Sequence, residues 1–261
     1  KPVEFITLQP MHTFGDERLR HWNAVCGLSV SADGKHAATV GEDLRVLVWD
    51  LEKGSVVKTL AEGRHNVDHR KTHTVFSRNG KRLIMHDLAA LSVYEWPSLE
   101  LTARVPTFVH RGVDSLDCTA DGNLIIFSHS VIPDDVAVIW KLAGNPLLES
   151  KRFTVKGDVA SISPDGRLFS TDYLSDADVR DTQTGESRWQ SEGGFDRLPQ
   201  FSPESDRVAI IENNSVYICR AEDGETLKEI EFEDVPYIRD AAISADLKVL
   251  AESSDNEVKL W

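Results

Sequence analysis

Short apolar runs alternate with polar residues along most of this chain, with the two-residue period that half-buried β-strands show. Residues 25–30 alternate in this way and lead into a turn that begins at Ser31. Two further strand patterns follow at residues 36–40 and 44–49, and an outer strand is expected at residues 55–60. The pattern therefore predicts four consecutive strands, each pairing with its neighbour along the chain.

The same pattern occurs six times. Each copy begins with a small hydroxyl residue and an Asp/Gly-type turn, followed by an apolar strand and a further strand. The copies begin at Ser31, Ser77, Thr119, Ser163, Ser202 and Ser244. Four of the turns contain an Asp-Gly or Asn-Gly pair, at positions 33/34, 79/80, 121/122 and 165/166. Such pairs predict tight hairpins because both residues tolerate a positive φ angle.

The spacing of the copies is typical of the blades of a β-propeller. Aligned on the first copy, the repeats place these residues in one register: Trp49, Trp96, Trp140, Arg180, Cys219 and Trp261. The steps between them are 47, 44, 40, 39 and 42 residues. A period in the low forties with several strands per unit predicts a propeller. We therefore expect residues 1–261 to form one all-β domain with six four-stranded blades.

The two ends of the chain are complementary in this scheme. Residues 3–8 have the pattern of a strand but no inner strands before them, while the last unit stops after its third strand at Trp261. We expect the N-terminal strand to complete the last blade and to remove a free sheet edge. Because the chain starts at Lys1 and stops within a Trp-Asp position, it is expected to be part of a longer protein. Seven blades are the alternative if the parent chain continues.

The first repeat resembles the Trp-Asp (WD) repeat family. His21 lies ten residues before Ser31, Thr39 lies four before Asp43, and Asp43 lies six before Trp49. The resemblance implies that His21, Thr39, Asp43 and Trp49 form a hydrogen-bonded set that stiffens the blade. Phrases such as Ser163-Pro-Asp-Gly also occur in other propellers, including those of some peptidases.

The resemblance weakens in the middle repeats. Asp134 precedes Trp140, and Asp255 precedes Trp261, by the same six residues as in the first repeat. Other residues occupy the Asp position (Ala90, Leu174) and the Trp position (Arg180, Cys219). We expect these middle blades to be less rigid.

Composition limits the classes of partner. Lys and Arg number 29 and Asp and Glu 43, so the formal charge is −14, which disfavours nucleic acid and anionic membranes as partners. No apolar run approaches the length of a membrane span. The three cysteines, Cys26, Cys118 and Cys219, lie in different repeats and are interpreted as small buried apolar residues. This favours a reducing compartment, and we expect a cytoplasmic protein.

Basic and aromatic residues recur just before the innermost strand of each unit, where a propeller has the mouth of its central channel. The predicted ligand-binding residues are Trp22, Arg70, Arg111, Lys156, Phe195, Arg197, Tyr237 and Arg239. On an anionic protein, such a ring of cations would attract a carboxylate or a phosphate. The alternative is a solvated rim whose cations pair with nearby acidic residues and bind nothing.

A cluster of histidines between the first two units offers a second kind of chemistry. His65, Asp68, His69 and His73 are residue types that bind zinc or another transition metal. Their spacing converges only on a helix, whereas a loop is expected here, and neighbouring cations oppose a metal charge. We therefore predict no metal and no cofactor. The sequence has no Walker loop, G-x-S-x-G, H-E-x-x-H or dinucleotide motif, so no enzyme activity is expected.

The sequence thus predicts a non-catalytic scaffold. The blades fix the backbone, while the connecting loops can vary and present a surface to a partner. We expect a monomeric domain that binds a protein or peptide partner, acidic or phosphorylated, on the loop face around the central channel. Two alternatives are a metal-assisted hydrolase that uses the cluster at residues 65–73 and a purely structural domain of a multidomain protein.

Overall fold

The computed structural model describes residues 21–22, 25–43, 45–61, 72–87, 90–107, 113–131, 134–142, 147–157, 159–173, 176–191, 199–212, 215–231, 240–243, 250–254 and 257–260. These residues form strands and turns, and none of them is helical. Within this part of the chain there is accordingly no helix long and apolar enough to cross a membrane. The predicted all-β fold class is confirmed.

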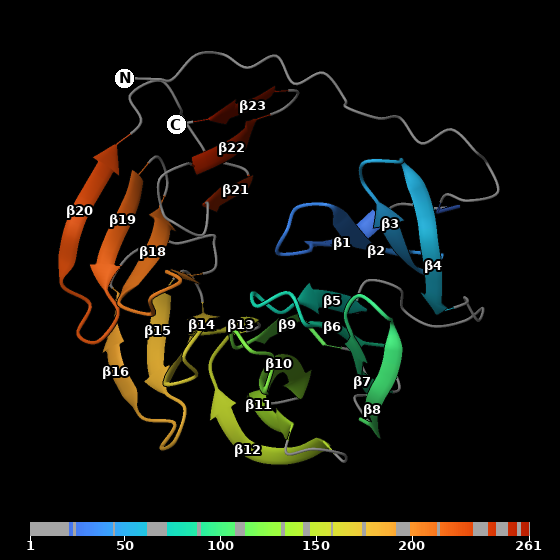
Figure 1. Ribbon diagram of the computed structural model, residues 1–261. Coiled ribbons are helices and arrows are strands. Elements are labelled where there is room, and N and C mark those ends of the chain that lie inside the picture. The colour runs from blue at the N-terminus through green and yellow to red at the C-terminus, as the bar shows by residue number, and fades with distance from the viewer. Residues whose placement is uncertain are drawn as a thin grey trace. The chain divides into compact units, whose positions relative to one another are not determined.

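The chain divides into two compact units, of which one lies within residues 10–154. This unit contains three four-stranded sheets in which neighbours in the chain are neighbours in the sheet (Figure 1). The first sheet contains β1 (Val25–Val30), β2 (His36–Gly41), β3 (Val46–Asp50) and β4 (Ser55–Ala61). The second contains β5 (His73–Phe76), β6 (Arg82–His86), β7 (Ala90–Glu95) and β8 (Glu100–Pro106). The third contains β9 (Ser115–Cys118), β10 (Leu124–Val131), β11 (Asp134–Leu142) and β12 (Leu147–Val155).

The second unit, from residue 155 onwards, contains two four-stranded sheets and a three-stranded sheet. The fourth sheet contains β13 (Val159–Ile162), β14 (Leu168–Tyr173), β15 (Asp176–Asp181) and β16 (Ser187–Gln190). The fifth contains β17 (Gln200–Phe201), β18 (Arg207–Glu212), β19 (Ser215–Arg220) and β20 (Thr226–Glu231). The last contains β21 (Asp240–Ile243), β22 (Leu250–Ser254) and β23 (Glu257–Leu260).

The number of blades stays a prediction. Five sheets have four strands, and the sixth has three in the described part of the chain. The segment expected to complete it, residues 3–8, lies outside the described residues. The single domain, the closure of a ring and the alternative of a seventh blade likewise stay predictions.

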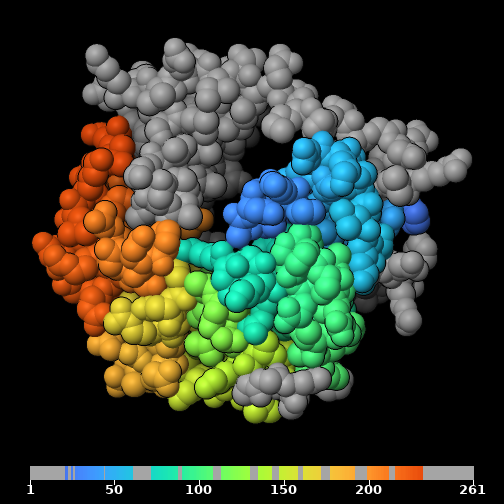
Figure 2. Space-filling view, in the orientation of Figure 1, coloured from blue at the N-terminus to red at the C-terminus, as the bar shows by residue number. Residues whose placement is uncertain are grey.

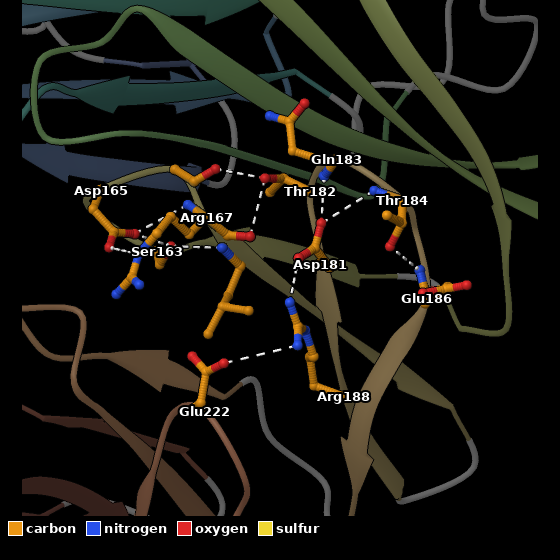
Figure 3. Close-up of polar contacts among 12 residues, drawn as sticks. Ser163, Asp165, Arg167, Asp181, Thr182, Gln183, Thr184, Glu186, Arg188 and Glu222 are labelled. Carbon is orange, nitrogen blue, oxygen red and sulfur yellow. Dashed lines mark hydrogen bonds and ion pairs between the residues drawn. The ribbon is translucent and has the colours of Figure 1, made fainter.

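A side-chain hydrogen bond closes the first hairpin of each of the first five sheets. Figure 3 shows the fourth copy, where the Ser163 hydroxyl donates to Asp165 Oδ1 over 2.7 Å and accepts from the Leu168 N–H at 3.0 Å. The Arg167 N–H also donates to Asp165 Oδ1, and Gly166 takes the positive φ angle of +75° that the turn needs. The hydroxyl–Asx bond recurs in the pairs Ser31–Asp33, Ser77–Asn79, Thr119–Asp121 and Ser202–Asp206. This is why the hydroxyl residue and the Asp/Gly turn mark each repeat in the sequence.

The core lies between neighbouring sheets. One cluster joins Val40 and Val48 of the first sheet to Phe76, Met85 and Tyr94 of the second. A second cluster joins the second and third sheets, and a third joins the fourth and fifth. Figure 2 shows the first sheet (blue) directly against the second (teal and green). Because the middle strands are covered on both faces, they are almost continuously apolar instead of alternating.

The observed strand pairing corrects one register assignment. Trp49 pairs with Ala37 in the first sheet, and the corresponding pair in the second sheet is Tyr94 with Leu83. Trp96, which the sequence alignment matched to Trp49, lies two residues later, in the turn after β7. There its ring contacts those of His36 and Phe76, with centroid distances of 4.8 and 5.0 Å. The assignments of Trp140, Arg180 and Cys219 agree with the observed pairing.

Candidate functional site

Four polar side chains of the first sheet meet in one hydrogen-bonded network. His21 precedes β1, Thr39 lies on β2, Asp43 lies in the turn after β2, and Trp49 lies on β3. His21 Nδ1 is 2.8 Å from Asp43 Oδ1, and His21 Nε2 is 2.7 Å from Thr39 Oγ1. The Trp49 indole N–H donates to Thr39 Oγ1 over 2.7 Å. The network thus ties the segment before β1 to three later positions of the sheet.

The chemistry of the four groups fixes the direction of two of these three hydrogen bonds. The indole N–H only donates, so Thr39 Oγ1 accepts from Trp49, and the same hydroxyl forms a hydrogen bond with His21 Nε2. The Asp43 carboxylate only accepts, so the His21 Nδ1–H donates to it. Every donor in the chain finds an acceptor, which is the condition for burying such groups without a large desolvation cost.

Asp43 also holds the backbone on both sides of the network. Its carboxylate accepts the N–H of Trp22 at 2.9 Å and the N–H of Arg45 at 3.1 Å. Partial burial acts to raise the pKa of Asp43, but the hydrogen bonds from His21, Trp22 and Arg45 outweigh it and lower the pKa below its ordinary value. The carboxylate therefore stays ionised near neutral pH and keeps its acceptor role.

Gly41 leaves the space that the network needs. A Cβ atom at this position would overlap the His21 ring and the Asp43 carboxylate. The backbone of β2 can therefore approach His21 only because residue 41 carries no side chain.

The network presents one aromatic side chain to solvent. Trp22 is 74% exposed, although its backbone N–H is held by Asp43. The Arg45 guanidinium lies over its ring, 5.1 Å from the centroid, in a cation–π contact. An exposed Trp on a fixed backbone, with a cation beside it, makes a preorganised contact point.

Comparison with known families decides what kind of repeat this is. The model of the WD domain, G-beta repeat, matches residues 9–50, which include all four residues of the network. The described residues form strands and turns, including five four-stranded sheets and one of three strands. Residues 9–50 are therefore similar to a WD repeat, and the strand content of the described residues is consistent with a WD-repeat propeller. WD repeats generally mediate interactions between proteins, and WD-repeat propellers are typically non-enzymatic scaffolds.

In the described residues of the third and fourth sheets, only parts of this network are present. In the third sheet the pairing places Phe127 where Thr39 stands, and the buried Trp140 Nε1–H has no partner among the described residues. In the fourth sheet Thr171 keeps the hydroxyl but Arg180 replaces the Trp. The buried Thr171 Oγ1 likewise has no partner in the described part of the chain. Each of these sheets thus has only one of the two side chains that form the Trp–Thr hydrogen bond in the first sheet.

Arg180 makes a different contact that the sequence reasoning missed. Its Nε donates to Asp178 Oδ2 over 2.7 Å, and its Nη1 donates to the carbonyl of Gly185. Asp178 also accepts from the Ser187 hydroxyl at 2.7 Å. Both charged side chains are largely buried, at 19% and 11% exposure. The signal in the sequence was the Asp-x-Arg spacing, which places both side chains on one face of a strand.

Two of the predicted rim residues lie in the described part of the chain. Trp22 and Lys156 are exposed. The others, Arg70, Arg111, Phe195, Arg197, Tyr237 and Arg239, lie outside the described residues. The ring of cations therefore stays a prediction. Arg45 was not among the predicted residues, although its position two residues after Asp43 places it beside the network.

The predicted alternative metal ligands are also mostly outside the description. His65, Asp68 and His69 lie outside the described residues. His73 lies on β5, and its Nε2 is 3.2 Å from the carbonyl oxygen of Val113. Among the described residues, no group of three or more His, Cys, Asp or Glu side chains is arranged to hold a metal ion.

Proposed function

We propose that this protein is a non-catalytic scaffold that binds an acidic or phosphorylated peptide segment on its loop face. The observation that carries the proposal is the Trp22–Arg45 pair beside the buried network of the first sheet. Trp and Arg are the residue types that contribute most to binding at protein interfaces. The other predicted rim residues belong to the proposed surface.

The net charge of the chain and the fixed backbone of Trp22 both favour this choice of partner. In a chain of net charge −14, a guanidinium stacked on an exposed ring is a local site for a carboxylate or a phosphate. The Trp22 backbone is already fixed by Asp43, so binding orders fewer groups and costs less conformational entropy. The ring supplies apolar contact area, and the cation supplies selectivity for an anionic segment.

The proposal is tested by selecting a ligand from a defined peptide library that contains acidic, phosphorylated and neutral members. Binding of the selected peptide is then measured for the wild type, Trp22→Ala and Arg45→Gln. We expect an acidic or phosphorylated peptide to be selected, and each substitution to weaken its binding at least tenfold, or about 1.4 kcal/mol.

A matched control comes from the same sheet. Val57 on β4 is 53% exposed, so Val57→Ala removes an exposed apolar side chain from another part of this sheet. It should leave peptide binding unchanged, and all three variants should unfold at the wild-type urea concentration, since Ala at position 22 keeps the N–H. Selection of neutral peptides only, or full binding by Trp22→Ala, would contradict the proposal.

We further propose that the domain acts as a monomer in the cytoplasm. The described cysteines, Cys118 and Cys219, are free and buried, which is compatible with a reducing compartment. Light scattering of the purified chain across a hundredfold concentration range tests the oligomeric state. A mass that rises with concentration would contradict the monomer.

A further inference from the structure

A buried imidazole in the second sheet plays no part in the proposed binding surface. His86 ends β6 and has no solvent exposure. Its Nε2 is 2.8 Å from the hydroxyl of Thr107, which follows β8. Its Nδ1 is buried without a hydrogen-bond partner among the described residues. The His86–Thr107 bond therefore ties the end of β6 to the end of β8.

The surroundings of His86 do not favour a positive charge. The ring packs against Phe127 of β10, with a centroid distance of 4.9 Å, and His129 lies beyond Phe127. His73 of β5 is paired directly opposite His86 in the sheet. The acidic neighbour is Asp87, and its carboxylate is already engaged by Arg104 of β8 at 3.2 Å and by the Ala90 N–H at 2.8 Å.

These contacts keep the imidazole neutral. Burial is the main cause that lowers the pKa of His86, to about 4, and the nearby His73 and His129 act in the same direction. Asp87 acts to raise the pKa, but it does not overcome burial. A protonated ring would also place a second N–H donor, at Nδ1, in a buried position that offers it no described acceptor.

We propose that His86 is an acid-sensitive lock that holds the β5–β8 sheet closed through Thr107, and that the sheet opens more often as the solution becomes mildly acidic. Opening exposes the ring to water, where a histidine binds a proton with its ordinary pKa of about 6.5. The open form thus binds more protons than the closed form between about pH 6.5 and pH 4. Acid therefore shifts the sheet towards opening, and the closed form is fully favoured only above that range.

The size of the effect follows from the two pKa values. Between pH 7 and pH 5 the opening equilibrium of the β5–β8 sheet should rise about twentyfold through His86 alone. Sheets without a buried neutral histidine of this kind should not respond in this way. In the fourth sheet, for example, residues 159–190 include no histidine.

Hydrogen exchange of the full chain tests the proposal. Protection factors, corrected for the intrinsic pH dependence of exchange, are compared at pH 7 and pH 5 for peptides from residues 73–107 and 163–190. We expect the first set to lose about twentyfold in protection relative to the second. His86→Gln can still donate to Thr107 but does not titrate, so it should remove this difference, whereas the control His36→Gln should retain it.

A second measurement uses only the wild-type protein. The chain has nine histidines, and their ring resonances can be followed by NMR as the pH is lowered. Nine titrations with midpoints above pH 5.5 would overturn the proposal, as would equal loss of protection in both sets of peptides. One imidazole that remains neutral down to about pH 5, together with selective loss of protection in the second sheet, supports it.

Discussion

A single hydroxyl can stabilise or destabilise a sheet, depending on whether its partner residues are present. Thr39 accepts from Trp49 and forms a hydrogen bond with His21 Nε2, so removing its hydroxyl leaves two buried groups unpaired. Thr171 occupies the same register position on β14, but its hydroxyl is buried with no partner among the described residues. The same substitution should therefore have opposite effects at the two positions.

Thr→Val keeps the shape of the side chain and removes only the hydroxyl. We expect Thr39→Val to lower the free energy of unfolding by about 3 kcal/mol, because the His21 and Trp49 nitrogens lose their partner. Thr171→Val should raise it by about 1 kcal/mol, because an unpaired polar group leaves the core. Urea unfolding of both variants measures the two changes. Loss of stability in both would show that Thr171 has a partner in the folded protein.

The Asp178–Arg180 pair should behave as a buried ion pair. Arg180→Ala leaves Asp178 as a buried carboxylate without its cation, so we expect the free energy of unfolding to fall by about 3 kcal/mol. Replacing both residues by apolar ones, as in Asp178→Val with Arg180→Met, should cost less than about 1 kcal/mol. The control is Arg167→Ala. The Arg167 side chain, which pairs with Asp165, is 68% exposed, so this substitution should lower the free energy of unfolding by less than about 1 kcal/mol. A double variant as unstable as Arg180→Ala would contradict this account.

Contacts between side chains could be predicted from the sequence only where the two partners lie close along the chain. The four residues of the first network stand within 29 positions, and the spacing from His21 to Trp49 was visible. Arg180 was interpreted as the loss of a Trp, because a missing aromatic residue does not reveal what replaces its contact. The His86–Thr107 bond spans 21 residues and joins residue types with no characteristic spacing, so no pattern indicated it.

At the scale of elements, the fifth hairpin departs from the turn chemistry of the other four. Ser205 has a φ angle of +62°, at the place where the other turns have a glycine. Its hydroxyl accepts the Asp165 N–H at 3.1 Å, so the side chain joins the fourth and fifth sheets. The hydrogen bond offsets the cost of a left-handed backbone conformation.

Two substitutions separate these effects. Ser205→Ala loses the hydrogen bond and keeps the strain, so we expect it to lower the free energy of unfolding by about 1 kcal/mol. Ser205→Gly loses the same bond but relieves the strain, and should be about 1 kcal/mol more stable than the Ala variant. Gly166→Ala provides the comparison, since it introduces strain at a φ angle of +75°. Equal stability of the two Ser205 variants in urea would show that the backbone is not strained there.

The elements themselves were well predicted, but one register was not. Hydroxyl–Asx turns and alternating runs are local, so they indicate each hairpin directly. Trp96 and Tyr94 are two residues apart, and a strand repeats its face every two residues, so alternation alone cannot distinguish them. The strand pairing, which depends on contacts across the sheet, resolved the choice in favour of Tyr94.

At the scale of the whole molecule, each compact unit contains a buried thiol. Cys118 belongs to the unit within residues 10–154, and Cys219 belongs to the unit that follows. Burial raises the pKa of both thiols, and that of Cys118 strongly. Neither should react with a thiol reagent in the native protein, because the thiolate is the reactive form and both are covered.

This allows a test of whether the chain is one cooperative domain. In a Cys26→Ser background, pulse labelling across a urea gradient reports the exposure of Cys118 and Cys219 separately. We expect both to become reactive in a single transition, at the concentration where the secondary structure is lost. Two separate midpoints would show that the two units unfold independently, and would contradict a single domain over residues 1–261.

The Asp43 carboxylate holds residue 22 through the backbone N–H and not through the side chain. Every amino acid except proline offers that same N–H. Substitutions at this position can therefore replace the exposed group without disturbing the support beneath it. In a duplicated gene, natural selection could change the partner that the protein recognises through one codon, with little loss of folding stability.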